Sequence, residues 1–127
     1  MQIWSLTDPG CVRTENQDAF AIQKLKRGAQ LCVVCDGMGG AKAGNVASAM
    51  AAEEFTKEVS ANYRSSMGME LLDSLLDQAV KKANFAVYDQ AQMDESCAGM
   101  GTTLVAVLLR GKNATVVNVG DSRAYGI

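Results

Sequence analysis

Short apolar runs alternate with polar turns along this chain, and two longer amphipathic segments interrupt them. The short runs have the length and the β-branched content of strands. They are Gln2–Thr7, Asp18–Lys24, Leu31–Cys35, Thr102–Leu109, Ala114–Val119 and Ser122–Ile127. Turn-forming residues separate them, as at Asp8-Pro9-Gly10 and Gly111-Lys112-Asn113. We therefore predict three strands before the amphipathic segments and three after them.

The amphipathic segments predict two helices, at Ala41–Val59 and at about Met69–Met93. In each of them apolar residues recur every three or four positions and so share one face. The first face carries Val46, Ala47, Met50, Ala51, Phe55 and Val59, and the second carries Leu72, Leu75, Leu76, Ala79, Val80, Ala83 and Val87. The order β-β-β-α-α-β-β-β, with strands grouped in runs, indicates an α+β fold. A hydrophobic content of 48% over 127 residues suits a single domain with a real core.

The net charge limits the kinds of binding partner that we expect for this chain. The net charge of -2 gives no reason to expect nucleic acid or an anionic membrane as partner. No apolar run has the length of a membrane span, and the N-terminus lacks the pattern of a signal peptide. We therefore expect a cytoplasmic protein.

The cysteines and the lack of histidine exclude several chemistries. Cys32 and Cys35 form a C-x-x-C inside an apolar strand, where their odd spacing places them on opposite faces. With Cys11 and Cys97 they are expected to be reduced, mostly buried thiols, not zinc ligands or disulfides. Since the chain has no histidine, Ser-His-Asp and Cys-His catalysis are excluded.

The most informative junction is the strand Leu31–Cys35 followed by Asp36-Gly37-Met38-Gly39-Gly40. We expect Asp36 at the end of the strand, where the backbone leaves the core. A carboxylate beside exposed carbonyl oxygens, with glycines that allow close approach of the backbone, outlines a site for a hard cation. The alternative is a strand that ends in a glycine-rich turn, with Asp36 as a turn or capping residue.

Three other segments bear on this site. Arg13 offers a planar fork suited to phosphate oxygens, and Asp18 is a second carboxylate at a strand start, although a surface charge and a turn residue are the simpler interpretations. Gly101-Thr102-Thr103 leads into a strand. Asp121, after Gly120, is either another oxygen ligand or the second residue of a type II′ hairpin.

Taken together and in order, these segments resemble the metal-dependent protein phosphatase 2C family, in particular its bacterial branch. The motifs are Arg13-x-x-Asn16-Gln17-Asp18, Asp36-Gly37-Met38-Gly39-Gly40, Gly101-Thr102-Thr103 and Val119-Gly120-Asp121-Ser122-Arg123. The resemblance extends over essentially the whole chain. It implies two antiparallel sheets packed as a sandwich, helix pairs on their outer faces, and a metal site in the cleft between the sheets.

The resemblance also implies roles for individual residues. Asp36 is similar to the carboxylate that bridges two Mn²⁺ or Mg²⁺ ions, and Gly37 to the residue that binds a metal through its carbonyl oxygen. Asp18 matches a carboxylate of the second metal, Arg13 the arginine that holds the substrate phosphoryl group, and Asp121 an aspartate of a third, weaker metal site. The implied reaction is hydrolysis of phosphoserine and phosphothreonine in proteins by a metal-bridged hydroxide.

Two departures from the family pattern qualify this expectation. Some members have histidine where this chain has Met38, and methionine cannot protonate a leaving alkoxide. The metal-binding aspartates that the family carries after the Gly-Asp-Ser-Arg motif are absent from this sequence, which stops at Ile127. We therefore expect an N-terminal portion of the catalytic domain, with weak metal affinity and little or no activity by itself.

Alternatives from other classes remain. A non-catalytic regulatory module would bind phosphopeptides or a partner through the same cleft. Nucleotide binding is disfavoured, because the glycine run lacks the Gly-Lys-Ser/Thr of a P-loop and follows a carboxylate. For the phosphatase, the resemblance implies phosphoprotein substrates and an opposing serine/threonine kinase, and an incomplete sandwich predicts dimerisation or domain swapping through an uncovered apolar face.

Overall fold

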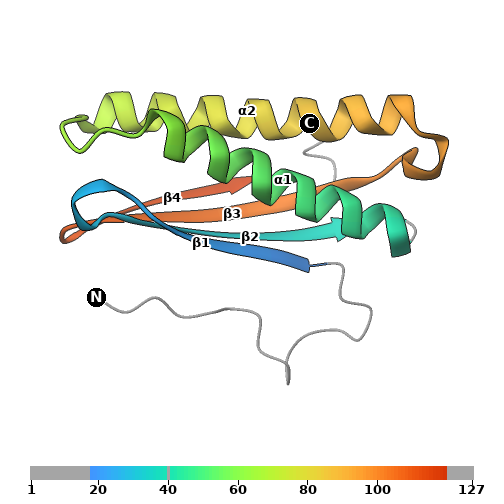
Figure 1. Ribbon diagram of the computed structural model, residues 1–127, viewed down its shortest axis with the longest axis horizontal. Coiled ribbons are helices and arrows are strands. Elements are labelled where there is room, and N and C mark those ends of the chain that lie inside the picture. Colours follow the sequence, from blue (N-terminus) through green and yellow to red (C-terminus); the bar gives the residue numbers. More distant parts are fainter. Residues whose placement is uncertain (1–17, 40, 120–127) are drawn as a thin grey trace, which may run out of the picture.

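The computed structural model describes residues 18–39 and 41–119, which form one sheet and two helices (Figure 1). The strands are β1 (Asp18–Lys24), β2 (Gln30–Met38), β3 (Gly101–Arg110) and β4 (Asn113–Val119), and the helices are α1 (Ala41–Asn62) and α2 (Met69–Met93). Two 3₁₀ turns, η1 (Lys26–Gly28) and η2 (Glu95–Cys97), complete the set. The sheet is antiparallel throughout, with the strand order β1-β2-β3-β4.

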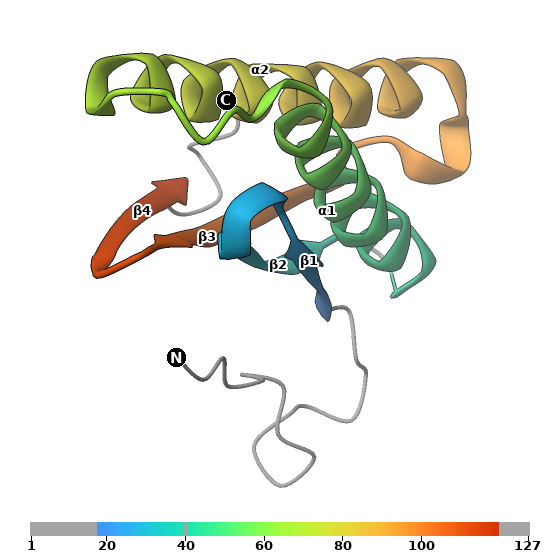
Figure 2. The ribbon, with the colours of Figure 1, turned by 60° about the vertical axis from the view of Figure 1, so that its left-hand side comes forward.

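Both helices lie on the same side of the sheet (Figure 1). Helix α1 packs across β1, β2 and β3, and α2 packs alongside α1. Figure 2 shows α2 on the side of β3 and β4, so the pair forms a layer above the sheet. In β2 and β3 alternate residues are buried beneath the helices because successive strand side chains point to opposite faces.

The helix faces predicted from periodicity form the core. In α1 the buried side chains include Ala47, Ala51, Phe55 and Val59, and Val46 and Met50 pack at its edge. In α2 all the predicted apolar positions are buried except Val80, which is partly buried. Both predicted helices are therefore confirmed, and α1 continues to Asn62 instead of ending at Val59.

The outer face of the sheet, on the side away from the helices, is also apolar. Phe20 and Ile22 of β1 and Val116 of β4 are exposed there. The pairing Phe20–Val34–Val105 shows that the apolar rows continue across β2 and β3. A two-sheet sandwich uses such a face for packing against its second sheet.

The predicted strand bounds agree with the structure except at the end of β2. Strand β1 has the predicted bounds, β2 and β4 each begin one residue earlier than predicted, and β3 is one residue longer at each end. Placing Asp36 at the strand end was wrong, because β2 continues through Gly37 and Met38, which pair with Thr102 and Gly101 of β3. The strands predicted at residues 2–7 and 122–127, and the turn at 120–121, lie outside the described residues.

No helix among the described residues combines the length and the apolar character needed to cross a bilayer.

Cys32 and Cys35 lie on opposite faces of β2, as predicted, and Cys32, Cys35 and Cys97 are free thiols. Burial raises the pKa of the Cys35 thiol to about 12, although a hydrogen bond with Thr102 opposes part of that shift. Since the thiolate is the reactive form, the Cys35 thiol should stay protonated and unreactive even at pH values well above 7.

We expect iodoacetamide at pH 8 to leave Cys35 unmodified in the folded protein and to alkylate it in guanidinium chloride, as peptide mass spectrometry would show. Equal labelling in both conditions would contradict this burial.

Candidate metal site

Two carboxylates meet across the first pair of strands. Asp18 on β1 and Asp36 on β2 are direct cross-strand partners. Partners in an antiparallel pair point to the same face, with Cβ atoms about 4.5–5.5 Å apart. The alternation of β2 places Asp36 on the outer face, opposite to the buried Cys35. The fold therefore brings together the two acidic residues that the sequence suggested as ligands.

This arrangement favours a cation. Like charges directly opposite one another on neighbouring strands repel, and a divalent ion between them turns that repulsion into attraction. Carboxylate oxygens are the donors that Mg²⁺ and Mn²⁺ prefer. The thiol of Cys35 lies on the helical face, so it does not take part in this site. The donor chemistry of the pair therefore fits a hard divalent metal.

Thr103 contacts the backbone of Asp36 from the neighbouring strand β3. It is the partner of Asp36 on β3, and its hydroxyl oxygen accepts a hydrogen bond of 3.3 Å from the backbone N–H of Asp36. Asp36 is thus held between Asp18 and Thr103 in one row across three strands. Sequence reasoning noted the Gly-Thr-Thr segment but gave Thr103 no role, because only the β2–β3 register reveals this contact.

The glycine turn after β2 is packed against the loop that leads into β3. Gly39 has φ of 128°, a conformation that side chains rarely adopt, and a methyl group there would lie 3.3 Å from Cα of Met100. The backbone after the candidate metal ligand therefore has little freedom to move away from Met100.

Replacing Gly39 by alanine should lower the free energy of unfolding by about 1–3 kcal/mol, through backbone strain and the contact with Met100. The matched control is Gly28→Ala, because Gly28 has φ of 80° but no atom within 4 Å of the added methyl group. Urea denaturation of both variants separates the two causes. An equal loss in both would show that the Met100 contact has no cost.

Two of the predicted site residues, Arg13 and Asp121, lie outside the described residues. Within residues 18–39 and 41–119, no group of three or more histidine, cysteine, aspartate or glutamate side chains comes together as a metal site. Asp18 and Asp36 are therefore the described carboxylates from which a site would be built.

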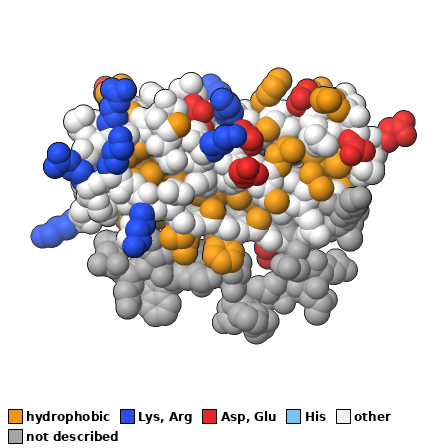
Figure 3. Space-filling model, in the orientation of Figure 1, with side chains coloured by type: hydrophobic (Ala, Val, Ile, Leu, Met, Phe, Trp, Pro, Cys, Tyr) orange, Lys and Arg blue, Asp and Glu red, His pale blue; other side chains and the backbone are white. Residues whose placement is uncertain are grey.

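The described segments nearest to this pair in the sheet carry little positive charge. No lysine or arginine occurs in residues 28–41 or 83–109. Figure 3 shows acidic side chains, and no basic ones, toward the end where α2 finishes. A phosphate that approached Asp18 and Asp36 would meet negative charge among these segments, and divalent cations would reverse that field.

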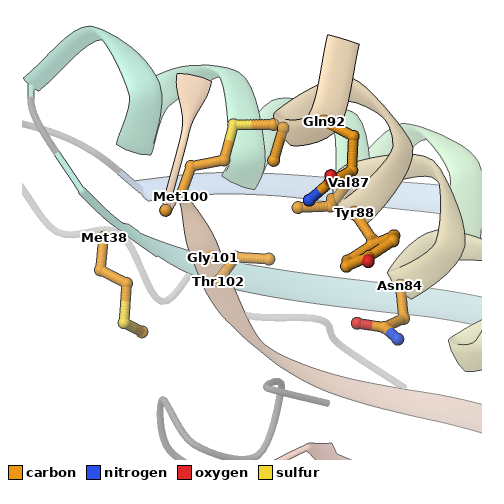
Figure 4. Close-up of a pocket in the computed structure, with 10 residues that line it drawn as sticks. Met38, Asn84, Val87, Tyr88, Gln92, Met100, Gly101 and Thr102 are labelled. Carbon is orange, nitrogen blue, oxygen red and sulfur yellow. The ribbon is translucent and has the colours of Figure 1, made fainter. Parts of the chain in front are cut away.

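A pocket of about 380 Å³ opens beside the start of β3 (Figure 4). Its walls come from the C-terminal half of α2, including Val87 and Tyr88, and from Met100, Gly101 and Thr102. Met38 at the end of β2 also lines it. The pocket was not predicted from the sequence, because it depends on how α2 is placed relative to β3.

Comparison with known proteins gives a consistent set of relatives. The family model described as protein phosphatase 2C matches residues 12–126. A serine/threonine phosphatase stp from Listeria monocytogenes is 36% identical over 124 residues, which cover 94% of this chain and 47% of that protein. The chain thus spans about half the length of that relative.

Solved structures agree. The serine/threonine phosphatase Stp1 from Staphylococcus aureus is 38% identical with a TM-score of 0.75, and the match covers 87% of this chain and 42% of that one. The catalytic domain of the phosphatase PstP, solved with two manganese ions, is 37% identical with a TM-score of 0.66, covering 87% and 44%. The fold has counterparts in these solved structures, and the family model matches most of the chain, so we conclude that this chain belongs to the protein phosphatase 2C family.

Proposed function

We propose that this chain forms part of a metal-dependent phosphatase that hydrolyses phosphoserine and phosphothreonine in proteins. The observation that carries the proposal is the opposition of Asp18 and Asp36 across β1 and β2. The relatives named serine/threonine phosphatases support the reaction, and the PstP domain with two manganese ions supports Mn²⁺ as the metal. Mg²⁺ has the same preference for oxygen ligands and is the alternative.

In this proposal the carboxylates of Asp36 and Asp18 and the carbonyl oxygen of Gly37 would hold two divalent cations, with Asp36 shared between them. Such cations supply an acidified water and neutralise the charge of the phosphoryl group. Thr103 keeps the backbone of Asp36 in place through the 3.3 Å hydrogen bond, so that the carboxylate is oriented before a substrate arrives. Neither Asp18 nor Asp36 needs to act as a nucleophile.

Arg13 and Asp121 complete the proposed site. Arg13 would hold the phosphoryl oxygens with its planar fork, and Asp121 would contribute to a third metal position. The phosphoproteins would be products of serine/threonine kinases.

The proposal is tested by manganese-dependent hydrolysis of p-nitrophenyl phosphate. Asp18, Asp36 and Gly37 offer fewer oxygens than the six that an octahedral ion requires. We therefore expect weak turnover from the isolated 127-residue chain, and stronger turnover from a longer form that supplies further acidic ligands. Robust turnover by the isolated chain would contradict the expectation that its activity is weak, but it would support the phosphatase assignment. Phosphopeptide binding without hydrolysis in both forms would instead favour a regulatory module.

The apolar outer face leads us to expect self-association of the isolated chain. Phe20, Ile22 and Val116 are exposed on that face, and a contiguous apolar surface of this kind is normally covered. Light scattering at rising concentration should show dimers or larger species, and Ile22→Lys should reduce them. A monomer at all concentrations would contradict the expectation.

A further inference from the structure

We propose that the pocket beside the start of β3 receives an uncharged, largely apolar side chain of the phosphoprotein substrate, close to its phosphorylated residue and accompanied by a basic residue. This inference rests on the proposed function and adds a substrate preference to it. Three observations carry it: the position of the pocket, its walls and the charges around it.

The pocket is close to the candidate metal ligands along the sheet. Gly101 pairs with Met38, and both line the pocket, whereas Asp36 pairs with Thr103. The two pairs are separated by two residues, or about 7 Å at the rise of a β-strand. An extended peptide whose phosphate lies at Asp36 therefore reaches the pocket with a residue roughly two to four positions away.

The walls contributed by α2 and the side chain of Asp36 lie on opposite faces of the sheet. Val87 and Tyr88 belong to α2, on the helical face, whereas alternation places Met38 on the outer face with Asp36. Figure 4 shows Met38 on the opposite side of the sheet from Tyr88. A peptide with its phosphate at Asp36 would therefore pass the start of β3 to place a side chain in the pocket.

The walls suit an uncharged side chain. Val87, Met100 and the ring of Tyr88 provide an apolar lining, and Gln92 offers an amide for the peptide backbone. The side chains that line the pocket include no charged group. The volume of about 380 Å³ accommodates a large side chain such as leucine or methionine.

The surroundings favour positive charge in the occupant. Residues 84–102 contain Asp89, Asp94 and Glu95 but no lysine or arginine. A basic residue next to the apolar one would be attracted to this segment, and an acidic one would be repelled. This charge pattern distinguishes a substrate peptide of the stated kind from a second copy of this acidic chain.

The test is fluorescence anisotropy with Mn²⁺, using the 127-residue chain and short labelled phosphothreonine peptides. One peptide carries leucine and lysine roughly two to four residues from the phosphothreonine, and its partner carries alanine and glutamate there. We expect the first to bind at least about tenfold more tightly, a difference typical of one well-buried side chain and one charge contact. Equal affinities would overturn the proposal.

Two variants assign the preference to the pocket. Tyr88→Ala removes an exposed wall, and Gln92→Lys adds a like charge at the mouth; each should abolish most of the tenfold preference. The matched control is Leu71→Ala, because Leu71 is 62% exposed on the same helix, Tyr88 is 61% exposed, and Leu71 lies outside the pocket. The proposal would be overturned if both pocket variants kept the tenfold preference for the leucine–lysine peptide. It would also be overturned if Leu71→Ala reduced that preference as much as the pocket variants do.

Hydrolysis of p-nitrophenyl phosphate separates this inference from the proposed function. That substrate has no flanking residues, so its turnover reports on the metal site and not on the peptide preference, and it should be the same in wild type and Leu71→Ala. If a longer form that supplies further acidic ligands also lacks turnover while the Tyr88-dependent preference persists, the pocket assignment stands and the phosphatase proposal fails. If turnover is present without any peptide preference, the pocket assignment fails alone.

Discussion

Replacement of Asp36 by asparagine is expected to lower manganese-dependent phosphatase turnover on the order of 1000-fold. Asparagine keeps the size and one oxygen of aspartate but loses the negative charge that would bridge two cations. Metal ions contribute several kcal/mol of charge stabilisation in such reactions, and about 4 kcal/mol corresponds to three powers of ten. The measurement is kcat/KM for p-nitrophenyl phosphate, in whichever form of the protein has measurable turnover, this chain or a longer one that contains it.

The control for this variant is Asp73→Asn on α2. Asp73 is also an aspartate, but it is exposed on α2 in the helix layer and lies outside the β1–β2 pair. Its replacement removes the same charge from the protein and should leave kcat/KM nearly unchanged. A loss below about tenfold in Asp36→Asn, or an equal loss in the control, would contradict the role assigned to Asp36.

The largest effect on stability is expected from Phe55→Ala. Phe55 is 0% exposed on α1 and belongs to the core between the helices and the sheet. Its truncation removes buried apolar surface and leaves a cavity, which typically costs about 3–5 kcal/mol. That loss is a large part of the 5–15 kcal/mol of a typical domain, so the variant should unfold at a much lower urea concentration.

Phe85→Ala is the matched control for this core variant. Phe85 has the same side chain but is 66% exposed on α2. Its loss should change the free energy of unfolding by no more than about 0.5 kcal/mol. Similar urea midpoints for the two variants would show that α1 does not pack as described.

Local pattern was sufficient to predict most elements. The bounds of β1 and α2 agree with the prediction because each segment keeps a single hydrophobic period and is flanked by polar or turn-forming residues. The end of β2 was misplaced because Gly37 and Met38 carry little strand propensity and extend the strand only through pairing with β3. The end of β2 is therefore set by its pairing with β3, and the residues of β2 alone do not indicate it.

The candidate site was predictable in part. The family motifs identified Asp18 and Asp36, and the register then placed them opposite one another. The hydrogen bond from the backbone N–H of Asp36 to Thr103 and the pocket beside Tyr88 were not predictable, because both join segments distant in sequence. Single-sequence reasoning finds residues of the right chemistry, whereas the contacts that orient them depend on strand register and helix placement.

The most direct test is Mn²⁺ binding followed by electron paramagnetic resonance in wild type, Asp18→Asn, Asp36→Asn and Asp73→Asn. The free ion gives a strong signal that bound ion lacks, so binding is measured without any need for turnover. We predict that wild type and Asp73→Asn bind Mn²⁺, and that each of the other two variants loses most of its affinity. Binding of equal strength in all four proteins would contradict the convergence of Asp18 and Asp36 on a metal.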